Sequence, residues 1–278
     1  MTKDPVSHCR VFCFMLKYET VVKNMSKSDN GNELLKKDEF IETLGKGVSL
    51  ICSPSHGFGT DAILLADFSS PKKNDKCCDL GCGCGIIPML WYRNGVREGI
   101  YGVDIQEYAA EQFSRSLRLN SSPENITVLN HDLRKIREAL PGGSFNLVTM
   151  NPPYKPAYTG ILSETDSDKI ARHETMCNID DVCKAAAFLL NFGGRFAMCH
   201  RPERLCDVIC SMRENGIEPK RIRFVMKRSD TAPWLFLIEG KRGAKPHITV
   251  MPPLIIQNEK GSNSEELDKI IGDYKGEE

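Results

Sequence analysis

The sequence predicts an α/β fold built on a mostly parallel sheet with an antiparallel hairpin at one edge. Short apolar runs typical of buried strands alternate with amphipathic segments typical of helices through the middle of the chain. Such alternation favours parallel strands joined by right-handed helical crossovers. The last two apolar runs, 221–227 and 234–240, have no helix between them, so we expect them to pair as an antiparallel hairpin.

Strands are expected where apolar residues run continuously between turn residues. The run CCDL, for example, ends at a glycine-rich turn, and FNLVTM ends at an Asn-Pro-Pro corner. The expected strands are residues 47–52, 77–80, 99–104, 126–132, 145–150, 194–200, 221–227 and 234–240.

Helices are expected where apolar residues recur every three or four positions. Residues 86–94 keep Pro88 in the first turn, where a proline is tolerated. Asn178 is a good cap for the helix that follows it, and Asp180 and Asp181 favour the positive end of its dipole. The expected helices are residues 61–68, 86–94, 106–119, 179–190 and 202–214.

The chain is expected to hold one domain between two polar ends. We expect residues 1–33 to be a poorly ordered extension, because NMSKSDNGN is polar and the apolar stretch before it is short. That stretch also lacks the small-residue cleavage site of a signal peptide. Residues 34–255 are expected to form the domain, and 256–278 a polar tail.

Composition excludes little but indicates where an anionic partner would bind. The apolar fraction is 41%, and no run of eighteen uncharged apolar residues predicts a membrane span. Lys+Arg and Asp+Glu are both 37, so the overall charge indicates no partner. Residues 193–250, however, hold twelve Lys/Arg against six Asp/Glu. This local surplus favours an anionic partner, although a solvated basic edge explains it equally well.

The twelve cysteines are interpreted as reduced thiols in a cytoplasmic protein. Four of them, Cys77, Cys78, Cys82 and Cys84, lie close together, but no second CxxC completes a set of four ligands. Two of the four lie at one end of a predicted strand, and the other two alternate with glycines. The sequence therefore predicts buried thiols and no metal site.

A glycine-rich loop, DLGCGCG at 79–85, follows a strand and opens a helix, which is where a doubly wound fold binds its ligand. The spacing is G-x-G-x-G rather than the G-x-G-x-x-G of dinucleotide sites. Asp104 ends the next strand and suits the two hydroxyls of a ribose; Asp132 ends the third and suits an adenine edge. We therefore prefer an adenosine-containing ligand to a plain tight turn. Asp79 suits an ammonium or a loop amide.

The segment NPPY, at 151–154, leaves the fourth strand in the same crevice. A residue before proline is restricted to extended backbone, so Asn151 is held with its side chain toward the cleft. Pro152 has a carbonyl but no N–H, and together the two residues offer two acceptors to one planar NH₂. Tyr154 offers a face for stacking, a contact that contributes about 1–3 kcal/mol per base. Alone, this segment is equally consistent with a proline-rich turn.

Two hydrogen-bond acceptors at one exocyclic amine can activate its nitrogen as a nucleophile. The lone pair of such an amine is delocalised into the ring, which makes the nitrogen a poor nucleophile. Acceptors for both hydrogens favour a pyramidal nitrogen, which localises the lone pair for attack on a sulfonium methyl group. No strong base is required, because the positive charge of the sulfur is lost as the amine gains it.

With these motifs in place, the chain resembles class I S-adenosylmethionine methyltransferases that act on amines. It is most similar to the bacterial tRNA (valine, adenine-37 N6) methyltransferases. The resemblance implies a Rossmann-like methyltransferase fold, with a seven-stranded, mostly parallel sheet and an antiparallel C-terminal hairpin strand. It covers about residues 40–255 through GFGTDAILLADF (57–68), DLGCGCGIIPML (79–90), GVDIQ (102–106), NPPY (151–154), ARHE (171–174) and FLIEGKRGAKP (236–246).

The resemblance also implies roles for individual residues. The cofactor S-adenosylmethionine would be bound by residues of the loop, the strand ends and the 57–61 segment: Thr60, Asp61, Asp79, Gly81, Cys82, Gly83, Gly85, Asp104, Ile105, Asp132, Leu133 and Asn151. The target base would be held by Asn151, Pro152 and Tyr154. The tRNA substrate would be contacted by Tyr154, Lys155, Arg172, His173, Lys220, Arg221, Lys241 and Arg242. Arg172 and His173 are equally suited to bracing the NPPY loop. No membrane and no metal partner is expected.

Two other methyltransferase classes fit the same motif. A protein-glutamine N5-methyltransferase acting on a release factor also presents NPPY to a planar NH₂, but usually carries a helical domain for which the lead-in here is too short. A ribosomal-RNA guanine N2 methyltransferase often has a second, degenerate catalytic domain. The sequence therefore favours methyl transfer to the N6 amine of an adenine in the tRNA anticodon loop.

Overall fold

The computed structural model describes residues 33–152 and 177–272. The chain divides into two compact units, Met1–Lys36 and Lys37–Glu278, and the fold below is that of the second. The expectation of poor order for residues 1–33 falls almost entirely outside the described residues.

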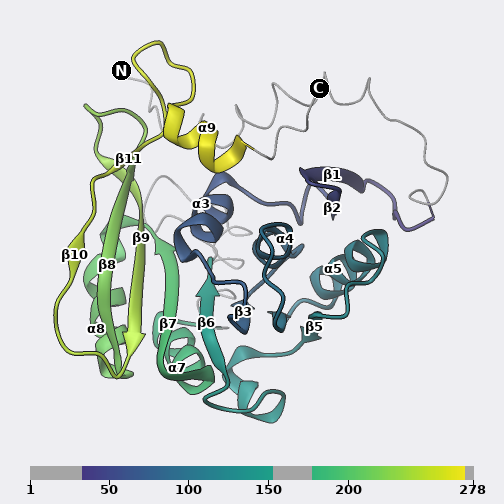
Figure 1. Ribbon diagram of the computed structural model, residues 1–278, viewed down its shortest axis with the longest axis horizontal. Coiled ribbons are helices and arrows are strands. Elements are labelled where there is room, and N and C mark those ends of the chain that lie inside the picture. The colour runs from purple at the N-terminus through teal and green to yellow at the C-terminus, as the bar shows by residue number, and fades with distance from the viewer. Residues whose placement is uncertain (1–32, 153–176, 273–278) are drawn as a thin grey trace, which may run out of the picture. The chain divides into compact units, whose positions relative to one another are not determined.

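The second unit is organised around one large, mostly parallel sheet (Figure 1). The strand order is β10-β8-β9-β7-β6-β3-β4-β5, with β11 also paired to β8. β9 is antiparallel to both β7 and β8, which confirms the predicted hairpin. The strands are β3 (Cys77–Leu80), β4 (Ile100–Asp104), β5 (Ile126–Asn130), β6 (Phe145–Met150), β7 (Leu190–His200), β8 (Ile217–Met226), β9 (Pro233–Arg242), β10 (Thr249–Val250) and β11 (Leu254–Ile255).

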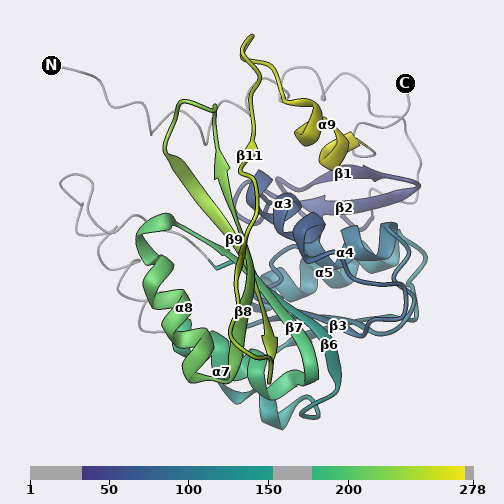
Figure 2. The same cartoon turned by 60° about the vertical axis from the view of Figure 1, so that its left-hand side comes forward.

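Helices cover both faces of the sheet and bury two apolar clusters (Figures 1 and 2). Leu64, Trp91 and Phe113 belong to the cluster on one side, and Val182 and Met212 to the cluster on the other. The first side carries α3 (Thr60–Ser69), α4 (Ile86–Arg93) and α5 (Glu107–Leu119); the second carries η1 (Leu133–Glu138), α7 (Ile179–Leu189) and α8 (Leu205–Glu214). The short helix η2 (Pro202–Arg204) precedes α8.

A separate antiparallel hairpin, β1 (Phe40–Gly45) and β2 (Val48–Cys52), packs beside α5. The Ser116 hydroxyl accepts a hydrogen bond from the Ile51 N–H at 2.9 Å, and Asn120 bonds both backbone groups of Ser49. The hairpin therefore fixes the residues that lead into α3.

Several strands are longer or shorter than predicted, for identifiable reasons. β8 begins at Ile217, before Pro219, because a bulge after the proline removes the need for its missing N–H. β5 ends at Asn130 rather than at residue 132, since the Asp132 side chain accepts from the Arg134 N–H at 2.9 Å and caps η1. β7 begins four residues earlier than expected, at Leu190.

The segment after residue 245 holds structure that the sequence analysis did not predict. β10 and β11 cover the outer edge of β8, which would otherwise leave unpaired backbone groups. The helix α9 (Glu265–Ile271) begins at Ser264, whose side chain accepts from the Leu267 N–H at 3.1 Å. Leu267 is buried, so part of the expected polar tail belongs to the folded unit. No helix in the described parts of the chain is long and apolar enough to cross a membrane.

Candidate active site

Four neighbouring parallel strands end at the same edge of the sheet and bring the predicted motifs together. β3 pairs in parallel with both β4 and β6, and β4 pairs with β5. The residues that follow these strands are the glycine loop, Asp104 with Ile105, Asp132 and Asn151. This carboxyl edge is where open α/β sheets bind their ligands.

In the glycine loop after β3, one glycine packs closely against the core and another leaves its backbone exposed to open space. Gly85 is pressed against the core, because a Cβ there would lie 2.2 Å from the Phe113 ring. Gly83, with a φ of +54°, would meet no atom within 4 Å, so its backbone borders open space. A positive φ at both positions favours glycine. The loop therefore offers bare backbone to a ligand on one side and a fixed anchor on the other.

Asp104 is buried and ties the glycine loop to the end of β4. One carboxylate oxygen accepts from the Gly83 N–H at 2.8 Å and the other from the Gln106 N–H at 2.9 Å. A carboxylate has about four lone-pair sites, so two acceptor positions remain for ligand hydroxyls. The arrangement suits the two hydroxyls of a ribose.

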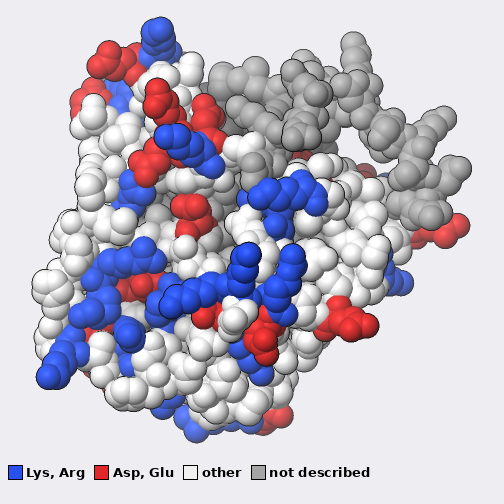
Figure 3. Space-filling view, viewed as in Figure 1, with Lys and Arg blue, Asp and Glu red and all other residues white. Residues whose placement is uncertain are grey.

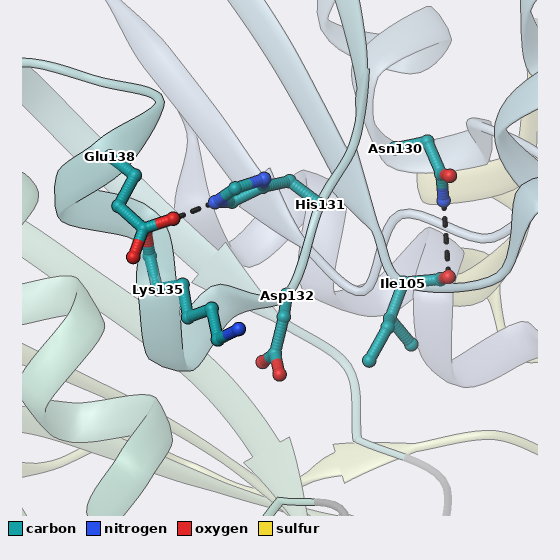
Figure 4. Close-up of a pocket in the computed structure, with 6 residues that line it drawn as sticks. All are labelled: Ile105, Asn130, His131, Asp132, Lys135 and Glu138. Atoms are coloured by element: carbon teal, nitrogen blue, oxygen red, sulfur yellow. Dashed lines mark hydrogen bonds between the residues drawn. The ribbon is translucent and has the colours of Figure 1, made fainter.

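A pocket of about 300 Å³ lies where β4 and β5 end, next to Ile105, the residue that follows Asp104 (Figure 4). Ile105 forms an apolar wall and has 44% of its surface exposed, unusual for a large aliphatic side chain. The Arg134 guanidinium hydrogen-bonds Asp132 and lowers the pKa of that carboxyl, which keeps it ionised as an acceptor. The pocket is lined by Ile105, Asn130, His131, Asp132, Lys135 and Glu138. Leu133, half-buried at the start of η1, packs against the core instead of lining the pocket.

Asp79 is a buried acid beneath the glycine loop. Burial raises its pKa to about 8, although the Thr149 hydroxyl donates to its Oδ1 at 2.6 Å and opposes that rise. Nearby Asp104 adds to the rise. The group is therefore mostly protonated at neutral pH in the ligand-free protein, and a cation brought to the loop would favour its ionised form.

Asn151 lies directly beyond β6, where its amide is held by a neighbouring strand. The Cys199 thiol, fully buried in β7, donates to Asn151 Oδ1 at an S···O distance of 3.2 Å. The strand register explains this contact, since Met150 pairs with Met198 and the next residues of both strands meet. Sequence reasoning missed Cys199, whose only signal is its place at the end of the predicted strand adjoining the NPPY segment.

Three further residues at this edge were also missed. His200 ends β7, and burial lowers the pKa of its imidazole to about 4, so the ring is neutral at pH 7. Its Nδ1 accepts from the Arg201 N–H at 2.8 Å. The Arg201 guanidinium lies over the Trp234 ring at 5.4 Å and donates to the Trp234 carbonyl at 2.8 Å. A cation and a flat aromatic face thus lie just beyond the carboxyl end of β7, the strand that pairs with β6.

The first residues of α3 point toward the same edge. Arg195, in the first half of β7, donates to the Ser69 carbonyl at the end of α3 at 2.8 Å. The end of α3 thus lies toward the amino side of the sheet, and Thr60 and Asp61 at its start lie toward the carboxyl side. Pro152 is half-buried beside Asn151. Tyr154, Lys155, Arg172 and His173 lie outside the described residues.

The predicted phosphate contacts on β8 and β9 are not at this edge. Lys241 pairs with Arg195 and Arg242 with Ile217, so these residues lie toward the amino ends of the parallel strands. The Arg221 guanidinium donates to Glu239 at 3.0 Å and to the Phe68 carbonyl at 2.6 Å. Arg242 donates to the Leu190 carbonyl. Lys220 donates to the Lys245 carbonyl at 3.1 Å. The structure thus gives Arg221 and Arg242 hydrogen bonds within the fold, and their contact with RNA stays a prediction.

No disulfide joins the described cysteines. All ten are free thiols, and seven of them are buried. Over residues 33–152 and 177–272, no group of three or more His, Cys, Asp or Glu side chains could hold a metal ion.

Comparisons with known proteins agree with this geometry. The family model described as the methyltransferase small domain matches residues 56–164. A tRNA1(Val) (adenine(37)-N6)-methyltransferase of Parabacteroides distasonis is 26% identical over 221 residues, which cover 78% of this chain and 89% of the relative. The protein of the same name from Porphyromonas gingivalis is 27% identical over 195 residues, covering 63% and 75%. A solved structure titled as a predicted O-methyltransferase of Agrobacterium tumefaciens shares the fold with a TM-score of 0.61 and 19% identity, covering 78% of this chain and 98% of that one.

The fold, the glycine loop with its acid and the family model over residues 56–164 are features that this chain shares with S-adenosylmethionine-dependent methyltransferases. The chain is also similar in sequence to the tRNA1(Val) (adenine(37)-N6)-methyltransferases.

Proposed function

We propose that this protein transfers a methyl group from S-adenosylmethionine to the exocyclic N6 amine of an adenine in the anticodon loop of a tRNA. One observation carries the proposal: Asn151 follows β6 at the same sheet edge where Asp104 binds the glycine loop. The activity named for the relatives agrees with an amine acceptor on RNA. The reaction is proposed to take place in the cytoplasm.

The residues present fit the cofactor. Gly83 leaves its backbone open, Asp104 keeps two acceptor positions, and Ile105 exposes an apolar wall beside a pocket of about 300 Å³. In this proposal Asp104 accepts the ribose hydroxyls, Ile105 contacts the adenine face and Asp132 its edge. S-adenosylmethionine supplies an electrophilic methyl group on a sulfonium.

Asn151 and Pro152 prepare the acceptor amine. Asn151 Oδ1 and the Pro152 carbonyl accept one hydrogen each from the amine, which localises the nitrogen lone pair. The Cys199 thiol donates to Asn151 Oδ1 and so fixes the orientation of the amide. After transfer, the same acceptors release one proton to water as the nitrogen returns to planarity.

An anticodon-loop adenine is a suitable target because its loop is single-stranded. Turning such a base outward costs only a few kcal/mol or less, since no pairing is lost. Tyr154 is proposed as the stacking face for that base, and its placement lies outside the described residues.

The direct test offers the purified protein labelled S-adenosylmethionine and unmodified tRNA, followed by digestion and identification of the product nucleoside. We expect N6-methyladenosine from the anticodon loop. A release factor and ribosomal RNA serve as competing substrates, because Asn151 and Pro152 suit any planar NH₂. Methylation of the release factor alone, or of a guanine, would replace the proposal.

A further inference from the structure

A bulge near the start of β7 presents an aromatic side chain to solvent. The residue pairs on either side of the bulge leave four residues of β7, 191–194, opposite a single residue of β6, Asn146. Phe192 lies within this bulge and is 85% exposed. Gly193 follows it with a φ of +82°, in the left-handed region that favours glycine. Because a bulge re-aims the side chains it carries, this one turns Phe192 away from the core.

Packing within the fold does not account for the position of this ring. Phe192 belongs to neither apolar cluster, and it is the only aromatic residue among the exposed large apolar side chains of the described residues. A Cβ at Gly243 would lie 2.2 Å from a carbon of the ring, so the ring rests against the backbone of that glycine. One contact therefore fixes the ring while most of its surface stays accessible to a partner.

Basic residues of β8, β9 and the turn after β9 lie at the same corner of the sheet. Lys241 is exposed, and its Cε would lie 3.4 Å from a Cβ at Gly193. Arg242 donates to a backbone carbonyl at the start of β7. Lys220 donates to the Lys245 carbonyl at 3.1 Å, and the Lys245 side chain is exposed. The bulge thus places an aromatic ring among cations from other segments.

The charge of this corner is predominantly positive. Glu218 stands opposite Lys241 in the β8–β9 register, but its carboxylate already accepts from the Arg213 guanidinium at 3.2 Å. Figure 3 shows Lys and Arg side chains gathered over its lower left part, where Figure 1 draws β8, β9 and β10. A positive surface of this kind attracts an extended anion.

We propose that this corner is a docking surface for single-stranded RNA, with one base stacked on Phe192 and phosphates bound by Lys241 and Lys245. Proteins bind single strands by combining an aromatic platform for a base with cations along the backbone. A basic edge alone attracts any anion, whereas a ring fixed among cations selects an anion that carries flat bases. The identity of this RNA as the methyl acceptor rests on the proposed function.

The docking surface is separate from the place of methyl transfer. Phe192 lies toward the amino side of the sheet, whereas Asn151 follows the carboxyl end of β6. The five steps of β7 from Arg195 to His200 alone span about 17 Å, at about 3.3 Å per residue. The base on Phe192 is therefore not the base presented to Asn151. The surface holds a second unpaired segment of the same RNA and adds affinity without touching the reacting amine.

The first test measures binding of fluorescently labelled, unmodified tRNA by anisotropy, with no cofactor present. Phe192→Ala should bind about five- to tenfold more weakly, since the stacking of one base is lost. Phe192→Leu is the matched control: it keeps an apolar side chain but has no flat face, and it should be weakened almost as much. Phe192→Trp should bind at least as tightly as the wild type. Leucine that binds like the wild type would contradict stacking.

The salt dependence of the same binding tests the cations. Lys241→Gln/Lys245→Gln should lower the salt slope by about one to two, because two phosphate contacts are lost. Phe192→Ala should weaken binding and leave the slope unchanged. The exposed pair Lys260→Gln/Lys269→Gln removes the same charge from the C-terminal segment and should match the wild type. A double control with the same loss of slope would show that only net charge matters.

The Phe192→Trp variant also reports stacking directly. A single-stranded oligoribonucleotide should quench the fluorescence that this tryptophan adds, and a blunt RNA duplex of the same length should quench it far less. Absence of quenching, together with wild-type tRNA affinity in Phe192→Ala, overturns the proposal. So does a wild-type protein that self-associates in sedimentation when Phe192→Ala does not, since the ring then covers a second copy of the chain. Failure of methyl transfer to tRNA leaves these binding results standing, so the two proposals fail separately.

Discussion

At the scale of single residues, the site depends on two buried hydrogen bonds that fix the orientation of polar side chains. Thr149 donates to Asp79 beneath the glycine loop, and Cys199 donates to Asn151 at the end of β6. Both donors lie on strands adjacent to their acceptors, and both are fully buried. A buried donor and acceptor that satisfy each other avoid the large penalty of an unpaired polar group.

The raised pKa of Asp79 predicts a specific dependence of stability on pH. Burial raises this pKa from 3.8 to about 8, so the folded state binds a proton that the unfolded state has released. The wild type should therefore lose stability as the pH rises from about 4 to about 8. Asp79→Asn removes that loss, and each pKa unit is about 1.4 kcal/mol.

Urea unfolding at pH 5, 7 and 9 measures this effect. The free energy of unfolding of the variant relative to the wild type should increase by several kcal/mol, on the order of 1.4 kcal/mol per pKa unit, over that range. A difference that stays constant with pH would show that Asp79 has an ordinary pKa.

The Cys199 contact predicts a catalytic effect without loss of fold. Cys199→Ala removes the donor to Asn151 Oδ1, and we expect kcat to fall about tenfold, equivalent to about 1.4 kcal/mol. Cys199→Ser keeps a donor and should restore most of the rate, with KM for S-adenosylmethionine unchanged in both variants. If alanine and serine behave alike, the thiol only fills space.

Some residues of the candidate site could be predicted from the sequence and others could not. Asp104 and Asn151 were predicted because each ends a recognisable strand. Cys199 and the Arg201–Trp234 pair were missed because their roles depend on which strands are neighbours, and on register. Residue type alone does not indicate which strand will lie beside Cys199, Arg201 or Trp234.

At the scale of elements, the glycine loop connects β3 to α4 through two positions with different constraints. Gly85 approaches Phe113 of α5, whereas Gly83 borders open space. Element types followed from periodicity, but boundaries did not, because β8 continues through Pro219 and Asp132 ends β5 by capping η1.

Alanine at these two glycines should separate stability from cofactor binding. Gly85→Ala places a methyl group against the Phe113 ring and should destabilise the protein by about 1–3 kcal/mol more than Gly83→Ala does. Gly83→Ala pays the cost of a left-handed backbone, about 1–2 kcal/mol, and should also bind S-adenosylmethionine more weakly. Urea unfolding and calorimetry report the two effects; equal losses of stability would contradict this division of roles.

At the scale of the whole molecule, the C-terminal segment completes the fold that positions the site. α9 packs against α3, whose first residues lie toward the carboxyl edge, and β10 and β11 cover β8. Residues 256–278, which include α9, were interpreted from the sequence as a polar tail because their buried residues are few and widely spaced. The placement of Arg221 was equally hidden, since its partner Glu239 lies on the facing strand.

Leu267 tests whether α9 belongs to the folded unit. Leu267→Ala removes a side chain that is only 3% exposed and should lower the free energy of unfolding by about 2–4 kcal/mol. The exposed Lys269, on the same helix, provides the control Lys269→Ala, which should change stability by about 0.5 kcal/mol or less. Two equal, small changes would mean that α9 does not pack as described.

The most direct test of the proposed site is single-turnover methyl transfer by Asn151→Ala, with S-adenosylmethionine binding measured on the same sample by calorimetry. The structure predicts that transfer to tRNA is lost while the Kd for the cofactor stays within about threefold of the wild type. Undiminished transfer, or loss of transfer and cofactor binding together, would contradict the role assigned to this residue.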